Sequence, residues 1–309
     1  MDTFTTMITP YQANGRVDEA AVEQYTHWYA AKGLSGIFAI CQSSEIFYLS
    51  LSERIAINRI VYDTVQKINQ DRENKITVVS SGHTAYDFEE QVREMNSVYD
   101  SNTDALIFIT NRLDPHNEGD DTFIRNAERL ISRLPDDARL GLYECPYPYK
   151  RLVTPRILKW CLETGRFDYM KDTCCDLAML KDRCEQLKGS AFKLLNANCQ
   201  TLLASYRYGA QGYCGIMANF HPQMYVKLGE IWQKDAQQAE LLQALIGQLG
   251  FTETGLPYPL TAKYHLCLEG IESALISRSR PGERLTEYAR HCVEQMKQLC
   301  DHLSAQGRI

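Results

Sequence analysis

Two side chains in this sequence suit covalent carbonyl chemistry, and each follows a stretch with the pattern of a strand. Lys171 comes directly after residues 167–170, and Tyr143 ends residues 140–143. A lysine at the end of a buried strand is poorly solvated, which favours the neutral amine that attacks a carbonyl carbon. A phenol beside it can carry protons during imine formation and carbon–carbon cleavage. The pair predicts Schiff-base chemistry; the alternatives are a lysine that extends to the rim of a barrel and a core tyrosine.

A hydroxyl-rich loop at residues 41–45 follows another strand-like stretch. Its residues are Cys-Gln-Ser-Ser-Glu. The hydroxyls of Ser43 and Ser44, together with loop N–H groups, could hold a carboxylate. The alternative is the ordinary polarity of a surface loop.

Strand-like stretches alternate with amphipathic helical patterns as far as about residue 233. We expect strands at residues 5–10, 36–40, 76–79, 105–109, 140–143, 167–170, 191–195 and 213–217. Asp18 and Ser52 are expected to cap the first two helices. About eight strand–helix units fit a closed (β/α)8 TIM barrel. An open doubly wound sheet is the alternative, but the sequence lacks the glycine-rich turn that such a sheet normally carries after an early strand.

The pattern becomes purely helical after residue 233, with helices expected at residues 241–249, 264–274 and 285–303. We therefore predict a barrel catalytic domain at residues 1–233 and a C-terminal three-helix domain at residues 234–309. The carboxyl ends of barrel strands converge on one face. Tyr143 and Lys171, on successive strands, should therefore face the same small volume.

The composition indicates a globular protein and argues against several kinds of partner. The net charge is −6 with 23% charged residues, and the scattered basic residues do not form a nucleic-acid track. No signal peptide and no stretch as long as a membrane span is evident. The 11 cysteines lie mostly in strand and helix patterns, which favours reduced thiols and the cytosol. The dispersed histidines predict no metal site, and no other cofactor is expected.

Five short motifs resemble, in order and spacing, those of the dihydrodipicolinate synthase/N-acetylneuraminate lyase family. The resemblance spans nearly the whole chain. The motifs are Thr9-Pro10 with Asn14-Gly15 and Asp18, Gln42-Ser43-Ser44-Glu45, Tyr143-Glu144-Cys145-Pro146, Met170-Lys171-Asp172-Thr173, and Gly209-Ala210-Gln211-Gly212 with Ala218-Asn219.

The resemblance implies a TIM barrel with a C-terminal helical domain, usually assembled as a homotetramer. By this resemblance, Lys171 forms an imine with pyruvate or another 2-oxo acid, and Tyr143 is the general acid/base. An aldehyde is the second reactant. The resemblance also implies that Gln42, Ser43 and Ser44 bind the substrate carboxylate. The backbone at Cys214 would line the pocket.

Departures from the family pattern argue against the lysine-pathway synthase. Cys41 and Ser44 replace the glycines of the Gly-x-x-Gly-Glu loop, and Pro148 stands where the synthases carry a substrate-binding arginine. The family's proton relay includes a second tyrosine, which would align near Leu113, so this chain lacks it. We expect Arg112 to replace the lost anion contact. A lyase that cleaves or condenses a 2-oxo acid with an aldehyde fits this pattern. The alternatives are a dehydratase of a 2-oxo-3-deoxy sugar acid and a protein that binds a 2-oxo acid without turnover.

Overall fold

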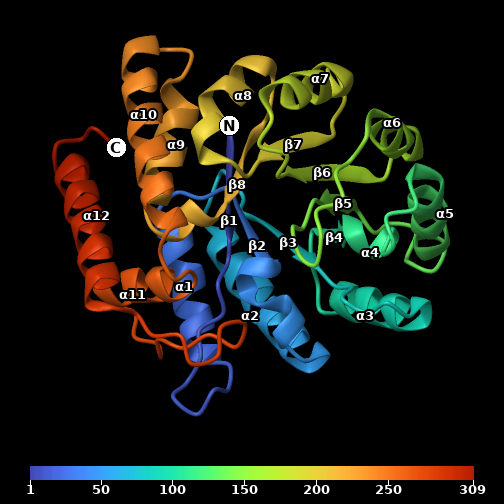
Figure 1. The fold of residues 1–309 in the computed structure, drawn as a ribbon, viewed down its shortest axis with the longest axis horizontal. Helices are drawn as coiled ribbons and strands as arrows, with labels where there is room; N and C mark the ends of the chain where they lie inside the picture. Colours follow the sequence, from blue (N-terminus) through green and yellow to red (C-terminus); the bar gives the residue numbers. More distant parts are fainter.

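Eight parallel strands close into a barrel in the computed structural model, which describes residues 1–253 and 255–309 in full and residue 254 by its backbone (Figure 1). Each strand pairs with the next, and β8 pairs with β1. The predicted (β/α)8 barrel is therefore confirmed. The strands are β1 (Asp2–Thr6), β2 (Gly36–Ile40), β3 (Thr77–Ser81), β4 (Ala105–Ile109), β5 (Leu140–Tyr143), β6 (Phe167–Asp172), β7 (Lys193–Asn196) and β8 (Gly212–Gly215).

Helices surround the barrel and continue beyond it. Around the barrel lie α1 (Glu19–Ala31), α2 (Leu51–Gln70), α3 (Phe88–Asp100), α4 (Thr110–Leu113), α5 (Asp120–Ile131), α6 (Pro155–Thr164), α7 (Leu177–Leu187), α8 (Leu202–Tyr208) and α9 (Pro222–Ile231). The chain then forms α10 (Ala236–Thr254), α11 (Leu260–Leu268) and α12 (Glu287–Ala305). Short 3-10 turns follow several strand ends: η1 (Gln42–Ser44), η2 (Ile46–Tyr48), η3 (Cys199–Thr201) and η4 (Ile216–Asn219).

Several element boundaries differ from those predicted. The first strand lies at residues 2–6, because pairing with β8 and β2 sets its extent. Ser50 rather than Ser52 caps α2: Ser50 Oγ accepts from Glu53 N at 3.2 Å, and the Glu53 carboxylate accepts from Ser50 N at 2.9 Å. The second C-terminal helix ends at Leu268, just before Gly270 at φ 90°. Asp18 caps α1 as predicted.

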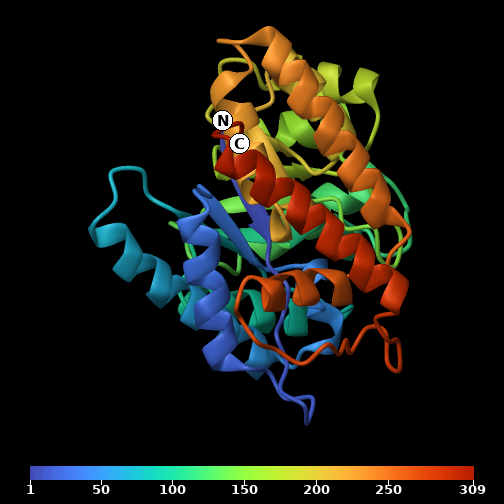
Figure 2. The same ribbon diagram turned by 90° about the vertical axis from the view of Figure 1, so that its left-hand side faces the viewer.

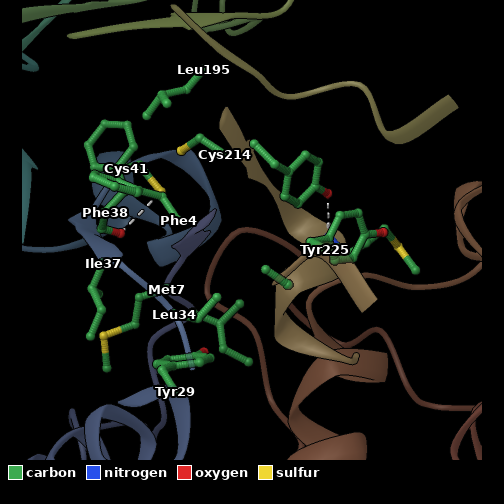
Figure 3. Packing of buried hydrophobic residues seen from close by; sticks show 14 of the residues in the cluster. Phe4, Met7, Tyr29, Leu34, Ile37, Phe38, Cys41, Leu195, Cys214 and Tyr225 are labelled. Carbon is green, nitrogen blue, oxygen red and sulfur yellow. Dashed lines mark hydrogen bonds between the residues drawn. The ribbon is translucent and has the colours of Figure 1, made fainter. Parts of the chain in front are cut away.

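The barrel interior holds aromatic and thiol side chains. Figure 3 shows Phe4, Phe38, Cys41 and Cys214 near one another, and all four are buried in one cluster. The Cys41 thiol lies 3.9 Å from the Phe38 carbonyl oxygen. These side chains form an apolar floor below the carboxyl ends of the strands.

The C-terminal helices pack directly on the barrel. Figure 2 shows α12 running along one side of the molecule, with α11 beside it. Leu242 and Ile246 of α10 and Met296 of α12 belong to the same buried cluster as the barrel residues. The predicted boundary near residue 233 falls between α9 and α10, and the division into two domains stays a prediction. Among the described residues, no helix has both the length and the apolar character needed to cross a bilayer.

We predict that Gly212→Ala destabilises the protein, because Gly212 lies where β8 closes the barrel against β1. A Cβ atom there would lie 2.4 Å from the backbone oxygen of Asp2. Overpacking of this kind costs about 1–3 kcal/mol, which urea unfolding can measure. Gly255→Ala is the control, since nothing lies within 4 Å of its added Cβ. Equal stability of the two variants would contradict the clash at the barrel seam.

Candidate active site

A cavity of about 560 Å³ opens at the carboxyl ends of the strands. Its lining comes from the ends of β5 and β6, from the loops after β2, β7 and β8, and from the C-terminal region. This is the face where a TIM barrel gathers side chains from sequentially distant loops. Among the residues predicted to form the site, those that line this cavity are Gln42, Ser43, Tyr143 and Lys171.

Tyr143 and Lys171 lie side by side at the base of the cavity. They are register partners on the paired strands β5 and β6. Lys171 Nζ lies 4.2 Å from the centroid of the Tyr143 ring and 5.6 Å from that of Phe38. The exposed fractions of Lys171 and Tyr143 are 7% and 3%. Within the described part of the chain, no salt bridge includes Lys171. The arrangement places an amine against a phenol in a nearly dry environment.

The surroundings of Tyr143 favour its protonated form. Burial raises the pKa of the Tyr143 phenol well above its ordinary value, and the thiols of Cys145, Cys41 and Cys214 add to this effect. The Cys145 thiol lies 3.3 Å from Gln42 Oε1, and burial raises the pKa of that thiol to about 11. A phenol that keeps its proton near neutral pH can act first as an acid.

A buried ion cluster holds the two strand ends together. Arg183, on α7, donates to Glu144 Oε1 at 2.6 Å and also bonds to Asp172. Glu144 directly follows Tyr143, and Asp172 directly follows Lys171. Glu144 Oε2 also accepts from the backbone N of Thr173 at 2.9 Å. Arg183 therefore fixes the spacing of β5 and β6 where the amine and the phenol meet.

The loop after β2 places two of its three predicted residues at the cavity. Gln42 and Ser43 line it, and the Ser43 hydroxyl donates to Thr6 Oγ1 at 3.2 Å. Ser44 is fully buried, with its hydroxyl 2.7 Å from Met7 O and 2.8 Å from Ala39 O. The Ser44 hydroxyl thus holds the loop, and its contact with a substrate carboxylate stays a prediction.

Two other predicted residues lie outside the cavity lining. The Arg112 guanidinium is buried between aromatic rings, 4.3 Å from the Tyr86 centroid and 5.1 Å from that of Phe47. Phe47 lines the cavity and Arg112 does not, and the role of Arg112 as an anion contact stays a prediction. Cys214 is buried in the barrel interior, and the residues after it, Gly215 and Ile216, line the cavity in its place.

Sequence reasoning missed several side chains that line the cavity. They are Lys150, Thr173, Tyr258 and Arg280. Tyr258 comes from the loop before α11, and its hydroxyl lies 3.3 Å from Asn219 Nδ2. Thr173 lies two positions after Lys171, and this proximity in the sequence could have predicted its place at the cavity. The positions of Tyr258 and Arg280 depend on how the C-terminal segment folds back.

Comparisons with known proteins agree with this architecture. Residues 1–73 match the model of the dihydrodipicolinate synthetase family. A 4-hydroxy-tetrahydrodipicolinate synthase of Saccharophagus degradans is 23% identical over 289 residues, covering 85% of this chain and 94% of that protein. The chain is therefore similar to the dihydrodipicolinate synthetase family, in its first 73 residues by the family model and over most of its length by this relative.

Solved structures show the same fold at low sequence identity. The dihydrodipicolinate synthase of Bacillus anthracis superposes with a TM-score of 0.83 at 17% identity, covering 96% of this chain and 97% of that one. A prophage protein from Escherichia coli K12, solved in complex with pyruvate, gives a TM-score of 0.81 at 21% identity and covers 98% of this chain and 99% of that one. These likenesses confirm the barrel and its connectivity.

We predict that Arg183→Met destabilises the protein by about 3–5 kcal/mol, because it leaves two buried carboxylates without their cation. Denaturant unfolding measures the loss. Arg156→Met is the matched control. Arg156 pairs with Asp121 on the surface, and its side chain is 60% exposed, so its loss should be at most about 1 kcal/mol. Similar losses in both variants would argue against the role of the buried cluster.

Proposed function

We propose that the chain is a class I aldolase that cleaves a 4-hydroxy-2-oxo acid to pyruvate and an aldehyde, or joins them in reverse. The observation that carries the proposal is the Lys171 amine held 4.2 Å from the ring centroid of Tyr143 at the base of the cavity. The pyruvate bound in the Escherichia coli protein of this family supports the choice of donor.

In the cleavage direction, the Lys171 amine adds to C2 of the acid. Loss of water, which carries away the former 2-oxo oxygen, leaves a protonated imine. Removal of the C4 hydroxyl proton then allows the C3–C4 bond to break. The aldehyde leaves, and the bonding electrons move toward the imine to form an enamine. Protonation at C3 and hydrolysis release pyruvate and restore Lys171.

Tyr143 is proposed to carry the protons in these steps. Its hydroxyl donates while the carbinolamine loses water and accepts when the C4 hydroxyl loses its proton. The raised pKa of its phenol suits the donating step. The Cys145 thiol lies beside Tyr143, where it can orient the phenol hydroxyl, and Gln42 contacts that thiol.

The substrate carboxylate is proposed to bind at Gln42 and Ser43. Both line the cavity next to Tyr143 and Lys171. The Gln42 amide and the hydroxyl and backbone N–H groups of this loop are donors that suit a carboxylate. Gly215 and Ile216 also line the cavity. Pro148, in place of the synthase arginine, argues against the lysine-pathway condensation.

A dehydratase would use the same imine but would expel the C4 hydroxyl as water and keep the carbon chain intact. Product analysis separates the two reactions. Pyruvate with an aldehyde supports the aldolase, whereas an intact dehydrated acid supports the dehydratase. The structure offers no observation that favours dehydration, so the aldolase is the leading proposal.

We also propose a cytosolic homotetramer. Eleven free cysteines, most of them buried, support a reducing compartment. Tyr48, Tyr86 and Tyr147 expose 46%, 63% and 50% of their surface near the cavity, which supports association through this region. Light scattering would give the mass of the assembly.

Borohydride trapping tests the imine directly. Incubation with pyruvate followed by borohydride should give a stable secondary amine on Lys171, identified by peptide mass spectrometry. Lys171→Arg should abolish the adduct, because a guanidinium does not form this imine. Lys193→Arg is the control, since Lys193 lies on β7 and pairs with Asp2 away from the cavity. The absence of an adduct on Lys171 with any 2-oxo acid would overturn the proposal.

Tyr143→Phe should lower kcat about 10²- to 10⁴-fold, because it removes the proton-carrying hydroxyl and keeps the ring beside Lys171. The slow variant should still accumulate some trapped pyruvate after long incubation. Tyr169→Phe is the control, since Tyr169 lies on β6 and is absent from the lining of the cavity, as far as the structure describes it. Unchanged turnover in Tyr143→Phe would assign the proton transfers to another group.

A further inference from the structure

Two basic side chains, Lys150 and Arg280, line the cavity in addition to Lys171. Neither belongs to the imine-forming pair. They come from distant parts of the chain, the loop after β5 and the segment between α11 and α12. Both are held at the cavity by specific contacts.

Lys150 is anchored beside the end of the lysine-bearing strand. Its Nζ donates to the Thr173 carbonyl oxygen at 2.7 Å. Thr173 is itself fixed: its backbone N donates to Glu144 Oε2 at 2.9 Å, and its hydroxyl donates to Glu144 O at 2.7 Å. One donor of the Lys150 ammonium is therefore used for positioning, and two remain for a ligand.

Arg280 is brought to the cavity by a buried carboxylate. Glu45 Oε2 accepts from Ser277 Oγ at 2.8 Å and from Ser279 N at 2.7 Å, while Lys263 Nζ lies 3.4 Å from Glu45 Oε1. Arg280 N then donates to Ser277 Oγ at 3.2 Å. The buried cluster fixes the backbone before Arg280 against the loop that carries Gln42 and Ser43.

The Arg280 guanidinium can still donate hydrogen bonds to a ligand. Its one ion pair, among the described residues, is with Glu283 at 3.3 Å, three positions along the chain. The Arg280 side chain is 53% exposed. Exposed pairs of this kind are weak and are easily exchanged for a better-placed anion.

The charges that line the cavity do not balance. Among its described lining residues, Glu45 is the one acidic side chain, and Lys263 already offsets its charge. Lys150 and Arg280 are cationic, and in the proposed reaction Lys171 becomes part of a protonated imine once the 2-oxo acid is bound. The carboxylate of a bound 2-oxo acid balances one positive charge, so an excess remains in the outer part of the cavity.

We propose that Lys150 and Arg280 form a subsite for a second anionic group, a carboxylate or a phosphate, at the far end of the substrate. This inference rests on the proposed function, because it takes the first carboxylate to lie near Lys171. It assigns the substrate class: the 2-oxo acid is at least dianionic, and the aldehyde released on cleavage keeps the second anion. In this proposal Lys150 and Arg280 take the role of anion contact that was predicted for Arg112, whose guanidinium lies behind Phe47.

Trapping with matched pairs of acids tests the subsite. The probes are 2-oxoadipate against 2-oxohexanoate, and 2-oxoglutarate against 2-oxopentanoate. Each pair shares its chain length and differs by the terminal carboxylate. 4-Phosphono-2-oxobutanoate tests a phosphate-like terminus. We expect half-maximal trapping of at least one dianionic probe at about a tenfold lower concentration than its neutral partner, as for a hydrogen bond between charged groups. The preference should weaken in high salt.

Variants then assign the effect to the two cations. Lys150→Met and Arg280→Gln should each reduce the preference for the anionic probe about tenfold. Lys150→Arg and Arg280→Lys should retain most of it, which shows that charge matters. Lys159→Met and Arg284→Gln are matched controls, because both side chains are exposed and, within the described lining, neither belongs to the cavity. Circular dichroism confirms folding of each variant.

The possible outcomes separate this inference from the proposed function. If pyruvate is trapped on Lys171 and no dianionic probe is preferred, the subsite is overturned and the aldolase proposal stands. A preference that survives both neutralising variants also overturns the subsite. If pyruvate is not trapped, calorimetric binding of 2-oxoadipate and 2-oxohexanoate replaces trapping. A preference that is lost in Lys150→Met and Arg280→Gln would then support the subsite in a protein that forms no imine.

Discussion

The site depends on one buried ion cluster, in which Arg183 bridges Glu144 and Asp172. Removing these charges from water is costly, and such clusters seldom contribute much net stability. Their value here is geometric. Each carboxylate directly follows one of the two paired residues, Tyr143 and Lys171, so the guanidinium links the ends of β5 and β6 in addition to the strand pairing.

A second buried carboxylate organises the opposite side of the cavity. Glu45 stands at φ 62°, in the left-handed region, and receives donors from Lys263, Ser277 and Ser279. Burial lowers the pKa of Lys263 to about 8, partly offset by Glu45. The loop after β2 and the segment before α12 are thus joined through one side chain. Residues beyond the predicted barrel boundary consequently take part in forming the cavity.

The loop after β2 departs from the family pattern at two positions. Ser44 stands in place of a glycine, and its hydroxyl lies within hydrogen-bond distance of Met7 O and Ala39 O. Cys41 replaces the other glycine and places its thiol in the apolar interior. Cys41 is one of three thiols, with Cys145 and Cys214, that add to the raised pKa of Tyr143.

The barrel and the Tyr143–Lys171 pair follow from patterns that are visible in the sequence alone. Alternating strand and helix patterns predict successive parallel pairing, and the strand ends then place Tyr143 beside Lys171. The periodicity also identified most helices, although element ends moved where caps and pairing decided them, as at Ser50. These features are local or follow from the order of elements along the chain.

Which polar groups reach the cavity depends on contacts between distant parts of the chain. Ser43 and Ser44 are adjacent in sequence, yet one lines the cavity and the other is buried, because the 3-10 turn rotates them apart. Arg112 and Arg280 are both plausible anion contacts by residue type. Aromatic packing places Arg112 behind Phe47, whereas the hydrogen bonds to Glu45 bring Arg280 to the cavity from 235 positions away. Side-chain direction depends on such long-range contacts, which residue type and spacing do not specify.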